Sequence, residues 1–96
     1  MRDRYVIIRC RDAGVHAGEL VRYEGRTVHL RNTRRIWYWS GAESLSELAL
    51  FGAANPRECK FAAELPEITL LEACEIIPCS PESEKMIRGC QKWVAS

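Results

Sequence analysis

The fold of this chain is decided by residues 15–31, which read VHAGELVRYEGRTVHLR. The first half of this segment predicts a β-strand interrupted by Gly18, and a glycine inside a strand is typical of a bulge or a sharp bend. Gly25 and the residue before it predict a short turn, because glycine readily adopts the positive φ that such turns need. Beyond the turn, Val28 and Leu30 fall on one face of a further strand. The segment therefore predicts a bent pair of neighbouring strands.

Two further apolar runs flank this pair. Tyr5–Arg11 alternates in the way that predicts a strand with one buried face. Ile36–Trp39 either continues the strand that precedes it, after a kink at Asn32-Thr33, or forms a new strand. Strands packed this closely within the first forty residues suggest a small curled sheet.

The sequence also predicts two short helices. Ser44–Glu47 is a capping box, in which the serine caps the helix and the glutamate reaches back. Gly52 is expected to end this helix. The second helix is expected to begin at Ser80-Pro81, with serine at the cap and proline in the first turn, and to end at Gly89.

Three segments of the second half are predicted to be extended. Cys59–Leu65 ends at a proline, and Gln91–Val94 predicts a short terminal strand with Trp93 packed on the sheet. Ile68–Ile77 is partly apolar on both faces, so we expect it to be one long central strand. Residues 1–96 are thus interpreted as a single α+β, β-rich domain. Its expected form is a curled antiparallel sheet or a small SH3/Sm-like barrel of about five strands with two short helices.

The composition narrows the class of protein. A content of 47% hydrophobic and 28% charged residues is typical of a globular domain and argues against disorder. No apolar run approaches the roughly 18 residues of a membrane span. The charged Met1–Arg4 is not followed by an apolar region of the length found in signal peptides, so we expect neither a membrane anchor nor a signal peptide.

The five cysteines show no CxxC pair and are odd in number, which favours small buried residues in a reducing compartment over disulfides or a metal site. Cys79 precedes the expected helix at Ser80, where the helix dipole could lower the pKa of its thiol; a structural role is the alternative.

The charge is unevenly distributed along the chain. Residues 1–40 hold nine arginines against four acidic residues, a balance of +5, whereas residues 41–96 hold five basic and nine acidic residues, a balance of −4. The planar guanidinium of arginine suits phosphate, carboxylate and aromatic partners. The alternative is that exposed strand faces simply carry arginine and that the two halves neutralise each other.

Residues 34–39 concentrate the groups that bind planar or anionic partners. In a strand, Arg35, Trp37 and Trp39 share one face, while Arg34, Ile36 and Tyr38 lie on the other. If Ile36 and Tyr38 face the core, the outer face presents a cation beside two indoles, which can hold a phosphate and stack a base. If the tryptophans face inward, they form the core of a small domain or a subunit interface.

The residues that follow could add hydrogen-bond donors to such a site. Ser40 and Ser44 flank the start of the first helix and could converge with Arg35 on one phosphate; ordinary capping is the alternative. His16 and His29 have no recognisable catalytic partner, and we interpret them as solvent-facing strand residues. We therefore expect no enzymatic activity, with histidine-dependent cleavage of a phosphodiester as the alternative, and no cofactor or metal. The candidate ligand-binding residues are Arg34, Arg35, Trp37, Trp39, Ser40 and Ser44.

The order of these motifs resembles known groups of proteins. The pattern of residues 17–32 is similar to the second and third strands of Sm-like and SH3-like small barrels. Most of the chain resembles a group of short, uncharacterised proteins encoded by tailed bacteriophages and prophages. The motifs that carry this resemblance are Asn32-x-x-Arg35, Trp37-Tyr38-Trp39-Ser40-Gly41-Ala42, Ser44-Leu45, Glu47-Leu48-Ala49, Cys59-Lys60-Phe61 and Glu75-Ile76-Ile77-Pro78-Cys79.

The resemblance implies a phage product that acts in the bacterial cytoplasm, where small accessory proteins often disarm host defences. We predict a non-catalytic protein that sequesters a nucleotide-type defence signal and forms a homo-oligomer. One alternative is an inhibitor that binds a host defence protein, such as a CRISPR or restriction component. The other is a small-barrel RNA- or DNA-binding module. No membrane partner is expected.

Overall fold

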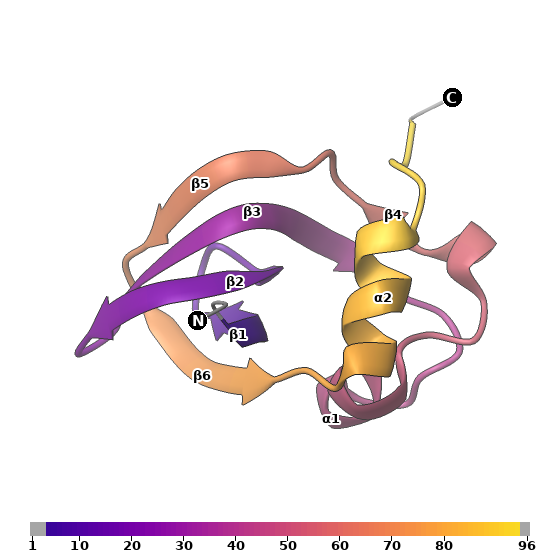
Figure 1. Cartoon of the computed structure of the whole chain (residues 1–96), viewed down its shortest axis with the longest axis horizontal. Coiled ribbons are helices and arrows are strands. Elements are labelled where there is room, and N and C mark those ends of the chain that lie inside the picture. Colours follow the sequence, from indigo (N-terminus) through magenta and orange to yellow (C-terminus); the bar gives the residue numbers. More distant parts are fainter. Residues whose placement is uncertain (1–3, 95–96) are drawn as a thin grey trace.

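The computed structural model describes residues 4–94, so the N-terminal residues 1–3, on which the signal-peptide prediction partly rests, lie outside it. Six strands and two helices follow one another along the chain (Figure 1). The elements are β1 (Arg4–Cys10), β2 (Val15–Glu24), β3 (Thr27–Tyr38), α1 (Leu45–Phe51), the 3-10 turn η1 (Pro56–Glu58), β4 (Lys60–Phe61), β5 (Leu65–Leu70), β6 (Ala73–Pro78) and α2 (Pro81–Gly89).

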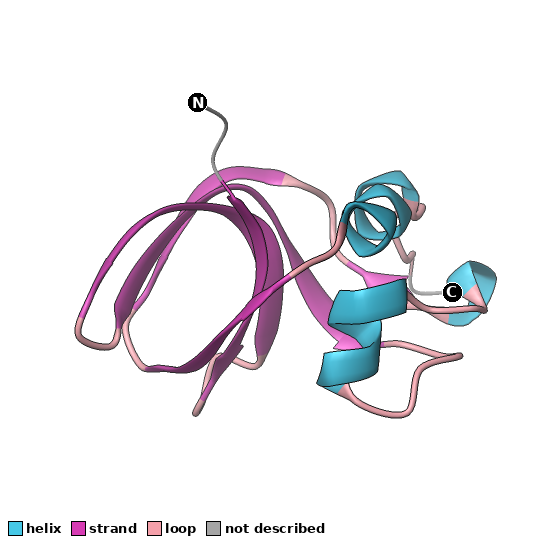
Figure 2. Ribbon diagram, turned by 60° about the horizontal axis from the view of Figure 1, so that its bottom comes forward, coloured by secondary structure: helices cyan, strands magenta, loops and turns pink. Residues whose placement is uncertain are grey.

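The strands form one antiparallel sheet in the order β4-β3-β2-β1-β6, and β5 also pairs with β3. The sheet is strongly curled, and the helices lie together at one end of it (Figure 2). No ladder joins β5 to β6 in the described part of the chain, so the curl is not closed into a barrel. The predicted α+β class with a curled antiparallel sheet is confirmed, with six strands in place of about five.

The β1 strand is buried on both faces, contrary to the prediction of one buried face. Its position between β2 and β6 places it against two separate cores. The inner core, inside the curl, contains Val6, Ile8, Cys10, Val28, Leu30, Leu70 and Ala73. The helix-side core contains Tyr5, Ile7, Ala17, Ile36, Leu48, Ala49, Ala53, Cys59, Phe61, Ile87 and Cys90.

The predicted bend at Gly18 is confirmed. The β2–β3 register shifts between Ala17 and Glu19, and a Cβ on Gly18 would lie 2.9 Å from the Cβ of Thr33. Asn32 adopts a φ of 50°, and its Nδ2 donates to the Glu19 carboxylate at 3.0 Å. These irregularities bend β3 without ending it, so the segment after Asn32 continues the same strand.

Both predicted helix starts are confirmed. The Ser44 Oγ accepts from the Glu47 backbone N–H at 3.2 Å, and Gly52 ends α1 with a φ of 75°. The Ser80 Oγ accepts from the Ser83 N–H at 3.0 Å, with Pro81 in the first turn of α2. Neither helix of the described chain has the length and apolar character needed to cross a membrane.

The prediction of one long central strand at Ile68–Ile77 is wrong. The chain turns at Leu71-Glu72, where both side chains are exposed, and divides the segment into β5 and β6. These strands then pair on different edges, β5 with β3 and β6 with β1. The segment Ile68–Ile77 is apolar at positions of both parities because β5 and β6 each face a core. Its apolar character does not come from a single strand in the middle of the sheet. The predicted terminal strand near Trp93 is a single parallel bridge between Phe61 and Lys92.

Candidate functional site

Two adjoining cavities open beside β3. The first, here called the Trp37 cavity, has a volume of about 290 Å³ and is lined by His16, Thr33, Arg35 and Trp37 on one side and by Ala62, Ala63, Leu65 and Ile68 on the other. The second, the Glu72 cavity, has a volume of about 300 Å³. Its walls come from Cys10, Asp12, Ala13, Arg35 and Ile68–Glu72. Arg35 and Ile68 belong to both cavities, so the two form one groove.

Arg34 points away from this groove. Its side chain is only 5% exposed and faces the helix-side core. Nε donates to the Ala62 carbonyl at 2.7 Å, and Nη1 donates to the carbonyls of Ile87 and Cys90. The guanidinium also lies 5.6 Å from the centre of the Phe61 ring. Arg34 therefore ties β3 to α2 and to the segment after β4, and its charge is surrounded by backbone carbonyls.

Arg35, the next residue, has the opposite environment. It is exposed, and its side chain makes no hydrogen bond or ion pair with any other residue in the range 4–94. The wall next to it includes Ile68, which packs against the inner core. An unpaired guanidinium beside apolar walls is a strong site for a carboxylate or a phosphate, because arginine can hold both oxygens in a fork.

The tryptophans divide between the two predicted roles. Trp37 is 53% exposed and lines the cavity named after it. Trp39 is half-buried against the helix-side core. Ile36, between them, is buried in the same core. The expected orientation with Ile36 inward and Arg35 and Trp37 outward is thus observed only as far as Trp37. Tyr38, expected inward, is 51% exposed, and Trp39, expected outward, packs on the core. The β3–β4 register shifts between Ile36 and Tyr38, so the alternation changes there.

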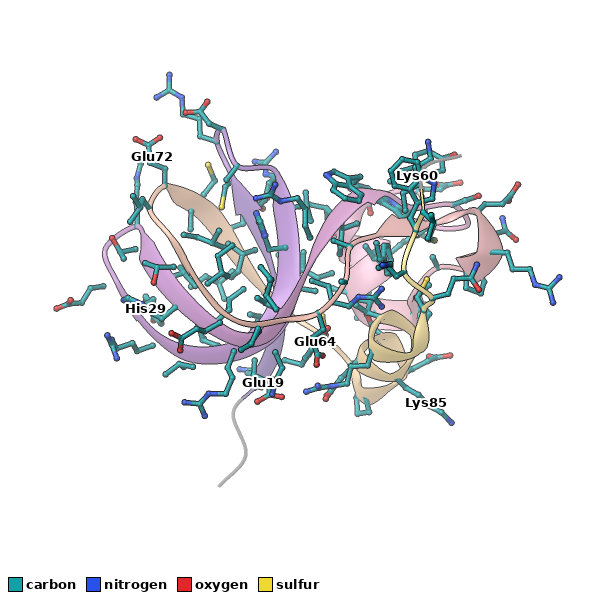
Figure 3. The ribbon with its side chains drawn as sticks, turned by 90° about the horizontal axis from the view of Figure 1, so that it is seen from above. Glu19, His29, Lys60, Glu64, Glu72 and Lys85 are labelled. Carbon is teal, nitrogen blue, oxygen red and sulfur yellow. The ribbon has the colours of Figure 1, made fainter. Side chains whose placement is uncertain are left out.

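Trp37 also belongs to a cluster of exposed aromatic side chains. Its ring packs edge to face on Trp93, with centroids 5.5 Å apart. The Lys60 Nζ lies 5.1 Å from the Trp93 ring and 5.9 Å from the Tyr38 ring. Figure 3 shows Lys60 at the helix end of the molecule, with Glu72 at the opposite end of the sheet. The aromatic cluster, defined as Trp37, Tyr38, Lys60 and Trp93, therefore continues the groove toward the helices.

The two predicted serines line neither cavity. The Ser40 Oγ accepts from Asn55 Nδ2 at 3.1 Å and donates to the Glu58 carboxylate at 3.3 Å. Ser44 serves as the cap of α1. The structure thus brings together Arg35 and Trp37, and it separates Arg34, Trp39, Ser40 and Ser44 from them.

His16 is a site residue that the sequence interpretation missed. It was expected to face solvent, but it is 1% exposed and pairs with Arg35 across the β2–β3 ladder. Its Nε2 donates to the Ala13 carbonyl at 2.9 Å. Burial lowers the pKa of His16, with a smaller lowering from Arg35, and the Ala13 hydrogen bond opposes this. His16 and its neighbour Ala17 point to opposite faces of β2 and are both buried, because this part of β2 lies between β1 and β3; burial of both faces depends on strand pairing that the local sequence does not reveal.

The five cysteines are free thiols that differ in burial. Cys10, Cys59 and Cys90 are buried as predicted, whereas Cys79 is half-buried and Cys74 is exposed. Burial raises the pKa of Cys79 to about 11, although a hydrogen bond from Ser83 opposes the shift. The idea that the helix start lowers this pKa is therefore wrong. Among residues 4–94, no three His, Cys, Asp or Glu side chains are grouped so as to hold a metal ion.

Residues 3–87 match the family described as "Domain of unknown function (DUF6948)". The chain belongs to this family. The matched range includes every strand, α1 and most of α2, together with Arg35 and all other residues of the groove. Trp93 lies beyond it. No curated protein and no solved structure matches the chain significantly.

Proposed function

We propose that this domain binds a nucleotide-type ligand, anionic and base-containing, without transforming it. The observation that carries the proposal is the free guanidinium of Arg35 beside the exposed ring of Trp37 in one cavity. Arg35 would hold a phosphate, and Trp37 would contact the base.

The chemistry of the cavity supports this ligand class. Ala63, Leu65 and Ile68 place apolar surface beside Arg35, and apolar surroundings strengthen the attraction between a guanidinium and an anion. Stacking of a base on an aromatic ring contributes roughly 1–3 kcal/mol. The cavity volume of about 290 Å³ is close to the lower end of ligand pockets, which begin at about 300 Å³.

The proposal assigns no catalytic role to the site. His16 is the histidine nearest to Arg35, and its Nε2–H already donates to the Ala13 carbonyl. The biological setting comes from the sequence resemblance: a phage protein in a bacterial cytoplasm that removes a nucleotide defence signal by binding it. A homo-oligomer belongs to the same proposal, and native mass spectrometry tests it by showing a dimer or a larger assembly rather than a monomer.

A thermal-shift screen tests the ligand class. The purified protein would be heated with mononucleotides, cyclic di- and trinucleotides, cyclic ADP-ribose isomers and short oligonucleotides at two salt concentrations. A ligand that binds only the folded state raises the melting temperature with its concentration. We expect a rise with one small nucleotide that changes little with salt. The absence of any rise across the screen would overturn the proposal.

The aromatic cluster favours a second candidate function. Trp37, Tyr38 and Trp93 are exposed, and aromatic residues are enriched among the side chains that dominate protein interfaces. An inhibitor that docks this cluster on a host defence protein would lose inhibition with Tyr38→Ser. The same substitution would leave nucleotide binding unchanged, because Tyr38 does not line the Trp37 cavity.

An RNA- or DNA-binding module is the third candidate. In this candidate function, the nucleic acid would bind to the arginine-rich strands β1 to β3. The analogy is with SH3/Sm-like barrels, of which the curled sheet would be an open relative. Binding of this kind falls steeply with salt, because each contacted phosphate releases counterions. In the screen, an oligonucleotide response that disappears at the higher salt concentration would favour this candidate.

A further inference from the structure

A mononucleotide would leave half of the groove unused. Its base and phosphate would occupy the Trp37 cavity and Arg35. The Glu72 cavity shares Arg35 as a lining residue and has almost the same volume, about 300 Å³ against 290 Å³. Arg35 therefore borders two compartments of similar size.

The Glu72 cavity has walls suited to a second ring. Cys10, Ile68 and Leu70 supply apolar surface, and all three pack in or against the inner core, which keeps them fixed. Asp12 and Glu72 also line this cavity, and Glu72 lies at the far end of the sheet from the helices (Figure 3). Two carboxylates would repel a second phosphate. They accept hydrogen bonds from amino groups, which adenine, guanine and cytosine carry on their edges.

We propose that the groove takes a dinucleotide, with its phosphodiester at Arg35 and one base in each cavity. This inference rests on the proposed function and specifies its ligand. The phosphodiester at Arg35 carries one negative charge, which matches one unpaired guanidinium; in a cyclic dinucleotide the second phosphodiester would have to face solvent, away from Asp12 and Glu72. The base in the Trp37 cavity contacts the indole, and the base in the Glu72 cavity directs its amino group to Asp12 or Glu72.

The same unit occurs in a free dinucleotide, linear or cyclic, and within a single strand of RNA or DNA. The free form would be bound as one unit. A strand would extend beyond the groove, and the aromatic cluster with Lys60 lies next to the Trp37 cavity in the direction of such an extension. The length of the ligand distinguishes the two sources.

Cavity-filling variants test the inference on the full chain. Ala63 lines only the Trp37 cavity and Ala13 only the Glu72 cavity, and both are exposed, so phenylalanine at either position should fill one cavity without disturbing a core. Calorimetry would measure AMP, the linear dinucleotide ApA, cyclic di-AMP and octa-adenylate with the wild type, Ala63→Phe and Ala13→Phe. Melting curves without ligand would confirm that each variant is folded.

We expect wild-type protein to bind ApA or cyclic di-AMP at least tenfold more tightly than AMP. Ala13→Phe should remove this advantage and leave the AMP affinity unchanged, whereas Ala63→Phe should weaken every probe. Octa-adenylate that binds tenfold more tightly again, with a steep salt dependence, would assign the groove to a strand; equal affinity would assign it to a free dinucleotide.

The opposite results separate two failures. If AMP binds as tightly as both dinucleotides, or if Ala13→Phe leaves their advantage intact, the dinucleotide inference is overturned while nucleotide binding stands. If the wild type binds none of the four probes, the inference is overturned together with the adenine-nucleotide form of the proposed function.

Discussion

Arg34 and Arg35 are neighbours in β3, yet their guanidinium groups lie on opposite faces of the sheet in opposite chemical settings. Arg34 is buried and donates to three backbone carbonyls. Arg35 is exposed and has no hydrogen-bond or ion-pair partner within the described chain. The first arginine holds the helices to the sheet, and the second leaves a cation available in a groove. Substitution of Arg34 should therefore lower the stability of the fold, whereas substitution of Arg35 should affect ligand binding at the proposed site.

The first prediction concerns stability at this pair. Arg34→Met removes the three hydrogen bonds that the guanidinium donates to the carbonyls of Ala62, Ile87 and Cys90. The Ile87 carbonyl keeps the Cys90 N–H, but buried carbonyls that lose their partner are costly. We expect a loss of roughly 2–5 kcal/mol in the free energy of unfolding. Arg35→Met should change it by no more than about 0.5 kcal/mol. Urea denaturation of both variants measures the difference, and equal losses would show that the two environments are not as described.

The second prediction concerns the bend in β2. Gly18→Ala places a Cβ 2.9 Å from that of Thr33, whose Oγ1 donates to the Ala17 carbonyl at 2.8 Å and cannot easily move. We expect a loss of roughly 1–3 kcal/mol. Gly89→Ala is the matched control, because a Cβ at this position would meet no atom within 4 Å. This substitution should stabilise α2 by about 0.5–1 kcal/mol. Thermal melting of both variants tests this, and a harmless Gly18→Ala would contradict the close approach of the strands.

The third prediction concerns pH. The folded state holds the pKa of His16 below its usual value of about 6.5, chiefly through burial. As the pH falls below about 6.5, the unfolded chain takes up a proton that the folded chain does not. The free energy of unfolding should therefore fall, by at most about 1.4 kcal/mol per pH unit from this group.

His16→Gln is the control for this pH dependence, because its amide can still donate to the Ala13 carbonyl but does not titrate. Urea denaturation between pH 5 and 8 should show a steeper acid loss in the wild type than in the variant. Parallel profiles would mean that His16 titrates normally in the folded protein.

The fourth prediction concerns Tyr5. Its hydroxyl is buried and has no hydrogen-bond partner among residues 4–94, and burial raises its pKa above the ordinary value. Tyr5→Phe removes this unsatisfied group and keeps the ring beneath the Arg88 guanidinium, 4.6 Å away. We expect no loss of stability, and a gain of up to about 1 kcal/mol. A loss above 1 kcal/mol in urea denaturation would indicate that the hydroxyl has a partner.

Local signals predicted the parts of the fold that depend on neighbouring residues. Gly18 predicted the bend, because the close approach of Thr33 leaves no room for a side chain there. Gly25 predicted the turn, because its positive φ favours glycine. Ser44 and Ser80 marked the helix starts, because their hydroxyls cap N–H groups three residues away. The shared outward face of Arg35 and Trp37 was predicted from the alternation of side chains along a single strand.

Features that depend on distant pairing could not be predicted. The division of Ile68–Ile77 arises because β5 and β6 pair with different strands, which no local pattern reveals. The burial of Arg34 depends on carbonyls as far along the chain as Cys90. The groove itself exists only because β5 returns to the edge of β3 and brings Ile68 to Arg35.

In the proposed function, Arg35 holds the anion of a nucleotide-type ligand. Calorimetric titration of the best ligand from the thermal-shift screen into the wild type, Arg35→Met and Arg57→Met tests it most directly. Arg57 is the matched control, because it is an exposed arginine on η1 that lines neither cavity. We expect Arg35→Met to weaken binding at least tenfold and Arg57→Met to bind as the wild type does. Equal affinity in all three proteins would contradict it.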